Sequence, residues 1–455
     1  MLSRRFLIAL AVTLGGLNTT SWATEKLTLT LERARELARL QNPAVRATVQ
    51  TVASALAQKG EAQAARLPTL FLSGRYARLS DVPPSSVTVP PNTPGMPPGG
   101  VSIPLAPTIL NSYNVTATMS APVFTGFRLE NRVKVTDHLA QAAAQDLGAK
   151  EAEVLLTIDQ AYWQLYSARA AARTISESVR LVEAHLADVR RMRAVGLTTD
   201  DDVLQVEVRL SQARLREIQS EHLAQMAQAA LANALSLPLE MEIALADSPT
   251  VIPRAVPSQD SLERLAMGNR PELRALDERL AALDRQVAIV RGGRLPNVMV
   301  QANYEYSNPN QRYFPTEEKW HGTWNVGVGL SWTFWDWGVV RNQTNRARAD
   351  LGQTDELARQ LREGVALQVV QSRLGVVQAA RRIAVAQDGV RQAREHYRNM
   401  KVRFEVGTAS NTEVLDAEVA LERAQLDLIQ ALADQQISWA KLDYAVGTKI
   451  SGSTE

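Results

Sequence analysis

The sequence contains no cysteine among its 455 residues. Disulfides, thiolate metal sites and cysteine nucleophiles are therefore excluded. A lipid anchor attached near the N-terminus needs a cysteine beside the cleavage site of an export signal, so we expect none. The same absence removes any redox chemistry based on a thiol pair.

Excess charge of one sign is also lacking. Lysine and arginine number 50, aspartate and glutamate 48, and the formal net charge is +2. Nucleic-acid-binding proteins usually concentrate basic residues on one face, so this balance argues against a nucleic-acid partner. After the N-terminus no stretch reaches the roughly 20 apolar residues of a membrane helix. A membrane-embedded part would therefore have to consist of β-strands.

Catalytic and metal-binding signatures are missing as well. The five histidines are dispersed, and no two of them are spaced to share a helix face. There is no HExxH motif, P-loop, GxSxG or dinucleotide fingerprint. The acidic residues lie on amphipathic helical patterns, where a solvated surface is typical. We expect no enzyme activity, no metal and no cofactor.

The first 23 residues have the pattern of an export signal. Arg4 and Arg5 precede an apolar run from Phe6 to Leu17, and Ser21-Trp22-Ala23 fits a small-x-small cleavage site. This order of a basic, an apolar and a small-residue region is typical of the general secretory route. The mature chain is predicted to start at Thr24.

The rest of the chain is an internal duplication. AVGLTTDDDVLQVEVRLSQARL from Ala194 matches EVGTASNTEVLDAEVALERAQL from Glu405, with equivalent residues 211 positions apart. Earlier matches, such as Asn42-Pro43 with Arg270-Pro271, are 228 positions apart. The first repeat therefore has 17 additional residues, which must lie between Arg78 and Phe124.

That interval contains the Pro/Gly/Ser-rich segment DVPPSSVTVPPNTPGMPPGGVSIPLAP. Its proline content disfavours both a helix and a strand ladder, so we expect a long exposed loop. A disordered linker between domains is the alternative. It fits less well because both flanks have the pattern of strands.

Four stretches alternate apolar and polar residues with the period of two that is typical of strands. They cover residues 69–78, 113–123, 297–306 and 324–333. Each is about as long as the roughly 9 to 11 residues of a membrane β-strand. The alternative is a soluble sandwich, for which the sequence offers no second sheet.

Four strands cannot close a membrane barrel, so their edges must pair with other subunits. Two chains would give eight strands around side chains, whereas three would give twelve around a lumen. Five of the eight tryptophans lie where an aromatic girdle of such a barrel is expected. They are Trp320, Trp324, Trp332, Trp335 and Trp337.

Long helical stretches without proline follow the strands. Residues 128–195 and 339–406 are each about 68 residues long, which corresponds to about 100 Å of helix. After the second glycine turn, Val414, Ala417, Leu421, Ala424, Leu428 and Ala431 are spaced by 3 and 4 residues. This seam predicts that the two limbs of each helical hairpin pack as an antiparallel coiled coil.

The resulting domain organisation has five parts. Residues 1–23 are the signal peptide. Residues 24–237 form the first repeat, with a helix, a β-hairpin at 67–125, a long helix, a tip at 195–200 and a return helix. Residues 238–258 are irregular. Residues 259–446 form the second repeat, with its β-hairpin at 295–335 and its tip at 406–410, and residues 447–455 form a flexible tail.

The duplicated phrases resemble those of the TolC-like outer-membrane efflux proteins, also called outer membrane factors. The resemblance rests on NPAVRA and RPELRA, RLPTLFLSG and RLPNVMVQA, APVFTGFR and WTFWDWGVVR, and the VGL and VGT tips. It covers almost the whole mature chain. It implies a mainly α protein with a membrane β-barrel portion, located in the outer membrane of a Gram-negative-type cell and reaching into the periplasm. In a homotrimer, four strands per protomer would complete a 12-stranded barrel above a long antiparallel coiled-coil α-barrel.

The resemblance also implies partners and a function. The tips would contact a periplasmic adaptor through Val195, Gly196, Leu197, Thr198, Val406, Gly407 and Thr408. The adaptor would connect the trimer to an inner-membrane pump or ABC transporter, and outer-membrane lipid would surround the strands. The implied function is a passive exit duct for tripartite efflux. Type I protein secretion is the alternative within the family, and a structural coiled-coil outer-membrane protein is the alternative from another class.

A periplasmic gate is implied at the acidic residues that follow the tips. In the family an acidic constriction lies six and nine residues after the second tip glycine, where this chain has Glu413 and Asp416. The first-repeat counterpart is Asp202. Three copies around an axis would form carboxylate rings with raised pKa values that attract cations. The alternative is that Glu413 caps its helix through Ser410-x-x-Glu413 and that Asp416 is solvated.

Two further residues would support the second tip. The family often has a basic residue four positions before the tip glycine, and Arg403 holds that position before Gly407. The first repeat has Met192 there, which argues against an arginine contact at the first tip. Phe404 takes the place of a family aromatic residue. Because it lacks a hydroxyl group, we expect closure at this tip to rest on packing.

Overall fold

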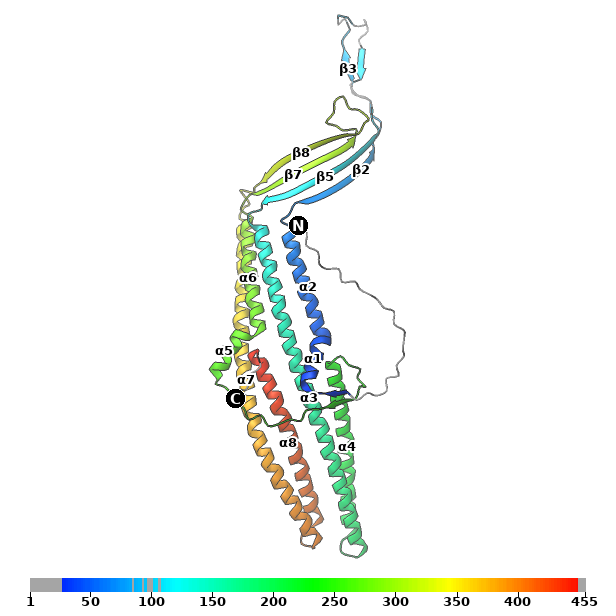
Figure 1. Ribbon diagram of the computed structural model, residues 1–455, viewed down its shortest axis with the longest axis vertical. Helices are drawn as coiled ribbons and strands as arrows, with labels where there is room; N and C mark the ends of the chain where they lie inside the picture. The colour runs from blue at the N-terminus through cyan, green and yellow to red at the C-terminus, as the bar shows by residue number, and fades with distance from the viewer. Residues whose placement is uncertain (1–26, 84–85, 92–93, 96–100, 105–107, 449–455) are drawn as a thin grey trace, which may run out of the picture. The chain divides into compact units, whose positions relative to one another are not determined.

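The computed structural model describes residues 27–83, 86–91, 94–95, 101–104 and 108–448 (Figure 1). It contains two compact units, which are described separately. The first comprises residues up to 42, 154–253 and 376–440, and the second comprises 43–153, 254–375 and residues from 441 onward. The predicted signal peptide at 1–23 lies outside the described residues, as does the tail from residue 449.

Each repeat begins with a helix that is interrupted at a proline. In the first, α1 (Leu31–Gln41) is followed by α2 (Pro43–Ala64); in the second, α5 (Gln259–Asn269) is followed by α6 (Pro271–Gly292). The residues before the prolines, Asn42 and Arg270, have extended backbones with ψ of 123° and 119°. A residue before proline disfavours the helical conformation, while proline itself is well tolerated at the first helical position. The break is therefore a local consequence of the sequence.

Each repeat contains one very long helix. These helices are α3 (Arg128–Ala194) and α7 (Val339–Glu405), each of 67 residues, and the return helices are α4 (Asp200–Ala234) and α8 (Asn411–Val446). Along the predicted seam of α8, Val414, Ala417, Leu421 and Ala431 are buried, and Ala424 and Leu428 are half-buried. Among the described residues, no helix combines the length and the apolar character needed to cross a bilayer.

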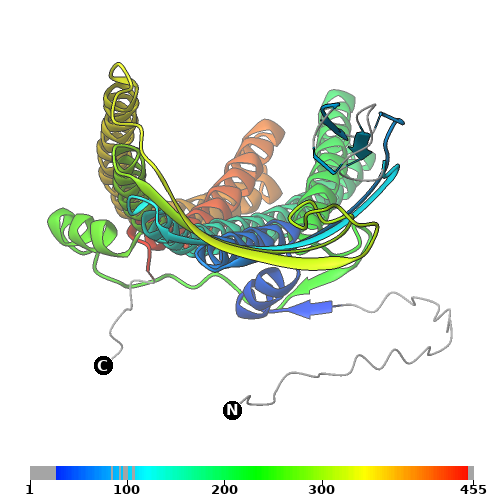
Figure 2. The same cartoon turned by 90° about the horizontal axis from the view of Figure 1, so that it is seen from above.

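The second unit contains a four-stranded antiparallel sheet. Its strands are β2 (Thr69–Arg78), β5 (Asn111–Phe124), β7 (Asn297–Asn308) and β8 (His321–Ser331), in that order. The central pairing of β5 with β7 joins the two repeats, and the sheet is visibly curved (Figure 2). Among the described strands, none pairs with the outer edge of β2 or of β8.

The register places apolar side chains in rows on one face of this sheet. One row runs through Leu72, Ala117, Tyr304 and Trp324, and the next through Leu70, Met119, Ala302 and Val326. The opposite face is mostly polar, with Phe71 and Met299 as exceptions. There Asn114 donates to Glu305 Oε1 at 2.6 Å, and Asn303 donates to Asn325 Oδ1 at 3.1 Å. The predicted alternation is thus confirmed, and it is coherent across all four strands.

Two small strand pairs were not expected from the sequence. Inside the proline-rich segment, β3 (Ser86–Val89) pairs with β4 (Val101–Pro104). The prediction of a loop without a strand ladder was therefore wrong for these residues, because the short runs SVTV and VSIP alternate β-branched side chains between the prolines. Within 238–258, β6 (Ile243–Leu245) pairs in parallel with β1 (Leu27–Leu29). Leu29 and Ile243 are fully buried there.

A glycine contact in the second unit provides a test of this packing. A Cβ added to Gly292, at the end of α6, would meet the backbone carbonyl oxygen of Gly126 before α3. We expect Gly292→Ala to lower the free energy of unfolding by about 1–3 kcal/mol, because rigid backbone must move apart. Gly352→Ala, in open space on α7, should instead raise it by about 0.5–1 kcal/mol. Circular-dichroism melting would measure both; an equal response of the two variants would contradict the close approach.

Candidate functional site

The two predicted tips have the same backbone structure. Gly196 and Gly407 have φ of 77° and 76°. At both tips the glycine N–H donates to the carbonyl three residues earlier, and the next N–H donates to the carbonyl five residues earlier. This is the Schellman arrangement, which requires a left-handed residue after the helix. No atom lies within 4 Å of a Cβ added at either glycine, so the positive φ alone accounts for glycine here.

The apolar side chains of the tips point into open space. Val195, Leu197 and Val406 are 70%, 71% and 69% exposed. Thr198 donates from Oγ1 to Asp202 Oδ2 at 2.6 Å, and Thr408 donates from Oγ1 to the Arg403 carbonyl at 3.1 Å. The threonines therefore stabilise the turns through hydrogen bonds, whereas the aliphatic side chains are free to contact another protein.

Each tip has an arginine contact, but the two contacts differ. Arg403 donates from Nη2 to the carbonyl of Thr408 at 2.9 Å. At the first tip Arg193 binds both carboxylate oxygens of Asp200, at 2.6 and 2.8 Å. In the first repeat Met192 holds the position equivalent to Arg403, and Arg193, one residue later, makes a different contact across the turn.

Two of the predicted gate carboxylates cap helices. The backbone N–H of Thr199 donates to Asp202 Oδ2 at 3.0 Å, and the backbone N–H of Ser410 donates to Glu413 Oε2 at 2.7 Å. The Thr199 and Ser410 hydroxyl oxygens accept from the backbone N–H of Asp202 and Glu413 in return, forming capping boxes. Hydrogen bonds from Thr198 and Thr199 lower the pKa of Asp202, and those from Ser410 lower the pKa of Glu413. Both groups are therefore held ionised within the chain.

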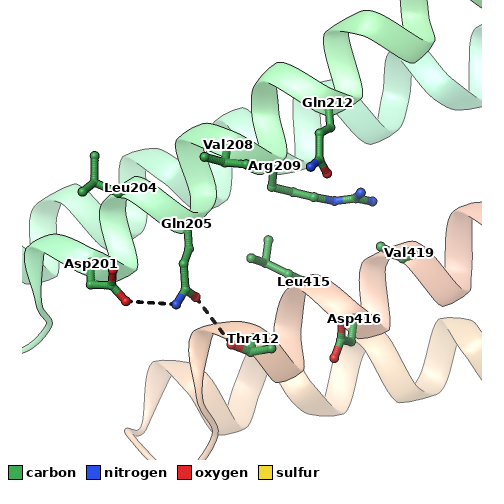
Figure 3. A pocket seen from close by; sticks show the side chains of 10 residues that line it. All are labelled: Asp201, Leu204, Gln205, Val208, Arg209, Gln212, Thr412, Leu415, Asp416 and Val419. Carbon is green, nitrogen blue, oxygen red and sulfur yellow. Dashed lines mark hydrogen bonds between the residues drawn. The ribbon is translucent and has the colours of Figure 1, made fainter.

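The third predicted gate residue, Asp416, lies in a groove between α4 and α8 (Figure 3). Gln205 crosses the groove, donating to Asp201 Oδ2 at 3.1 Å and accepting from Thr412 at 3.5 Å. Ten side chains line it: Asp201, Leu204, Gln205, Val208, Arg209, Gln212, Thr412, Leu415, Asp416 and Val419. The structure thus brings Asp416 together with polar residues of α4 that the sequence did not single out.

Arg209 is the positive charge of this groove. Its Nε and Nη2 atoms are buried, and within the described part of the chain they have no hydrogen-bond acceptor. Burial, and next the charge of Arg216, lower the pKa of the Arg209 guanidinium, while Glu418, Glu422 and Asp416 favour its charged form. Any field that Asp416 produces is therefore partly offset by a neighbouring cation.

A buried polar cluster lies between α3 and α8. Ser178 Oγ is 2.8 Å from Glu418 Oε1 and 2.6 Å from Glu422 Oε2. A hydroxyl has one proton to donate, so two such short contacts require that one carboxyl group supplies a proton of its own. Arg216 Nη2 lies 3.3 Å from Glu422 Oε2, and burial raises the pKa of Glu418 to about 7. Below pH 7, Glu418 is therefore the carboxyl group that carries this proton.

His185 provides a second polar connection next to the tips. Asn411 uses its amide nitrogen to donate to the carbonyl of Asp202 at 3.2 Å, so its Oδ1 accepts from His185 Nε2 at 2.7 Å. The His185 ring also meets Phe404 edge-on, with centroids 5.1 Å apart. Burial is the main cause that lowers the pKa of His185, which keeps the ring neutral near pH 7. Phe404 is buried in an aliphatic cluster that also contains Val182, Leu186 and Val206.

The five tryptophans form two groups at opposite ends of β8. At its start Trp320 stacks on Tyr306, with centroids 5.0 Å apart, and Trp324 lies on the apolar face. Beyond its end Trp332 donates to the Arg294 carbonyl at 3.0 Å, and Trp335 meets Trp337 edge-on at 5.4 Å. All five are exposed. Among the described residues, no group of three or more potential ligand side chains is arranged to hold a metal ion.

Comparison with known proteins gives consistent matches. A sequence model of the family described as outer membrane efflux protein matches residues 34–236 and 262–448. Protein CyaE of Bordetella pertussis is 27% identical over 223 residues, which are 48% of this chain and 46% of CyaE. The chain thus aligns with less than half of that relative.

Two other matches cover more of the chain. The alkaline protease secretion protein AprF of Pseudomonas aeruginosa is 25% identical over 358 residues, 74% of this chain and 70% of AprF. The open state of the MtrE outer membrane channel of Neisseria gonorrhoeae has the same fold, with a TM-score of 0.76 at 16% identity. That superposition covers 93% of this chain and 90% of MtrE.

The protonated Glu418 predicts a pH-dependent stability. Its pKa in the folded chain, about 7, exceeds the ordinary value of 4.5, so its contribution is complete below pH 4.5 and is lost as the pH rises through 7. The loss would reach up to about 3 kcal/mol. Glu418→Gln stays neutral and can still donate to Ser178, so its melting temperature should fall less between pH 5 and pH 8.

The matched control is Glu207→Gln, at the equivalent position of the first repeat, where the carboxylate is paired with Arg190 on the surface. Its melting temperature should follow that of the natural chain across the same pH range. If Glu418→Gln kept the full pH dependence, the shared proton would have to lie elsewhere.

Proposed function

The chain belongs to the outer membrane efflux protein family, and from this membership we propose that three copies form an exit duct for tripartite efflux. Its location is the outer membrane of a Gram-negative bacterium. In the proposed assembly, four strands from each copy complete a 12-stranded barrel above a periplasmic tunnel of helices. The duct conducts passively from a periplasmic adaptor and an inner-membrane pump to the exterior, without chemistry of its own.

The exposed apolar face of the sheet is the observation that carries this proposal. Along β8, Trp324, Val326, Val328 and Leu330 alternate with polar or small residues, and all four are exposed. Such an apolar face is stable in contact with lipid, and the polar face then points into a lumen. The unpaired edges of β2 and β8 then require neighbouring strands, because unpaired backbone groups are costly in lipid. The aromatic groups at both ends of β8 fit the two membrane interfaces.

The exposed tips support the proposed contact with the adaptor. Val195, Leu197 and Val406 are largely exposed, and the glycine turns hold them in a fixed backbone geometry. A periplasmic adaptor that presents apolar residues would bury them. The tips are not equivalent in side-chain chemistry, since Arg193 binds a carboxylate and Arg403 binds a backbone carbonyl.

The proposed gate combines Glu413, Asp416 and Asp202. Around a threefold axis each residue would occur three times, and such carboxylate rings attract cations. The caps fix Glu413 and Asp202 in position, whereas Asp416 remains in the groove beside Arg209. Asp416 is therefore the residue whose charge we expect to influence permeation most directly.

Protein secretion is the second candidate, favoured by the match to AprF, whose name describes protease secretion. The same duct geometry serves either role, since a passive lumen does not select its cargo. Purification of the natural protein with its bound partners would distinguish the two functions. A drug or ion pump favours efflux, and an ABC transporter with a polypeptide substrate favours secretion.

The first test concerns assembly and conductance. In detergent, the protein should be a trimer by light scattering, and in planar bilayers it should conduct poorly, since its tips hold the periplasmic end closed. A stable monomer, or absence of the protein from isolated outer membranes, would refute the duct.

The second test separates charge from helix capping. Asp416→Asn should raise the conductance and weaken block by divalent cations, because it removes a ring of charge. Glu413→Gln keeps an acceptor for Ser410 and removes only charge, whereas Glu413→Ala also removes the acceptor of the capping box. Equal conductance of Asp416→Asn, Glu413→Gln and the natural trimer would exclude these carboxylates from the gate. A change in Glu413→Ala alone would assign the effect to loosening of the tip.

A further inference from the structure

Two arginines of α4 have unused hydrogen-bond donors beside the Glu418 cluster. Nε and Nη2 of Arg209 and Nε of Arg216 are buried, and none of the described residues accepts a hydrogen bond from them. Arg216 nevertheless binds Glu422 Oε2 through its Nη2 at 3.3 Å. A buried donor without an acceptor is costly, so an acceptor that becomes available nearby will attract the Arg209 guanidinium.

Glu418 is the acceptor that can become available. Its short contact with Ser178 Oγ requires a proton on the carboxyl group while Ser178 donates to Glu422. In this form Glu418 is neutral and gives a guanidinium little reason to approach. Once ionised, it offers a charge-assisted hydrogen bond, which is stronger than a neutral one.

The groups that face Glu418 come from all four long helices. Ser178 lies on α3, and Tyr397 of α7 is a phenol whose pKa is raised by burial and by the charge of Glu418. The charged neighbours are Glu422 of α8 and Arg209 and Arg216 of α4. Since Arg216 already binds Glu422, Arg209 is, among the described residues, the cation that can respond to a charge on Glu418.

Arg209 also faces the groove between α4 and α8, together with Asp416 (Figure 3). Asp416 and Glu418 are two residues apart on α8, so their side chains point to different sides of the helix. Asp416 is exposed and Glu418 is buried. The charges of both act on Arg209, which therefore has one carboxyl group in the groove and another inside the packing.

This arrangement occurs in one repeat only. Glu207, the equivalent of Glu418, is paired with Arg190 on the surface. The positions equivalent to Ser178 and Arg209 hold Gly389 and Ala420, which have neither a hydroxyl group nor a charge. The cluster is therefore not a general consequence of a long helical hairpin.

We propose that Arg209 sets the attraction of the groove for cations and that the proton on Glu418 controls Arg209. While Glu418 holds its proton, Arg209 remains beside Asp416 and offsets its charge. When Glu418 releases the proton to solvent, Arg209 donates to the Glu418 carboxylate, and the charge of Asp416 is no longer offset. Three such carboxylates in the proposed trimer then attract cations more strongly. The inference rests on the proposed duct and adds a pH-dependent control of its permeation.

Block of the current by Mg²⁺ in planar bilayers measures this charge. Trimers of the natural chain should be blocked at a lower Mg²⁺ concentration at pH 8 than at pH 6, because Arg209 offsets Asp416 only at pH 6. Glu418→Gln stays neutral, so weak block should persist at both pH values. Arg209→Gln has no cation to offset Asp416, so strong block should occur at both.

The variants distinguish this control from direct titration of the carboxylate rings. Rings that titrate by themselves would keep the pH dependence of the block in Glu418→Gln and in Arg209→Gln. That result, in samples that light scattering shows to be trimers, would overturn the role of Arg209. Glu207→Gln is the matched control and should retain the pH dependence of the natural chain.

The melting temperature gives a second readout, which needs no conducting channel. The charge of Arg209 favours the ionised form of Glu418, so Arg209→Gln should move the pH at which the melting temperature falls to a higher value. An unchanged pH midpoint would contradict the pairing of Arg209 with Glu418. A raised midpoint in a protein that forms no conducting trimer would support the pairing and overturn the proposed duct.

Discussion

The packing of α3 against α8 is the constraint on which the tip end of the molecule depends. It joins the two repeats through an aliphatic cluster that includes Val182, Leu186 and Leu415. Phe404 from α7 and Val206 from α4 enter the same cluster, so all four long helices share one core there. The capped starts of α4 and α8 and the two glycine turns are held in place by this contact. The positions of the acidic residues of the proposed gate therefore depend on the packing of α3 against α8.

Polar groups within this packing give it a defined register. Aliphatic seams tolerate sliding by one helical turn, whereas a buried hydrogen bond is lost when its partners move apart. His185 with Asn411, and Ser178 with Glu418 and Glu422, fix α3 relative to α8 at two heights. Burying carboxyl groups is costly, and a proton on Glu418 together with the charge of Arg216 reduces that cost. The polar cluster therefore lowers stability at high pH and fixes one register of α3 relative to α8.

The sheet obeys a different constraint. Its apolar rows cross all four strands, and they are not covered by any of the residues that the structure describes. Side-chain alternation along a single strand is visible in the sequence, but the agreement between strands depends on pairing. A shift of one residue in any pair would mix the two faces. The observed register keeps Leu72, Ala117, Tyr304 and Trp324 on the same side.

The sequence alone determined the features that depend on neighbours within one or two turns. These are the helix breaks at Pro43 and Pro271, the glycine turns, the capping boxes of Asp202 and Glu413, and the alternation of the strands, all of which follow from local backbone preferences. The duplication also showed which positions are equivalent. Only the tertiary structure decided which member of each equivalent pair is buried. Glu418 is buried in the core while Glu207 lies on the surface, and His185 is buried while His396 is exposed. Burial depends on which distant segment packs against a residue, and two similar local patterns do not specify that segment.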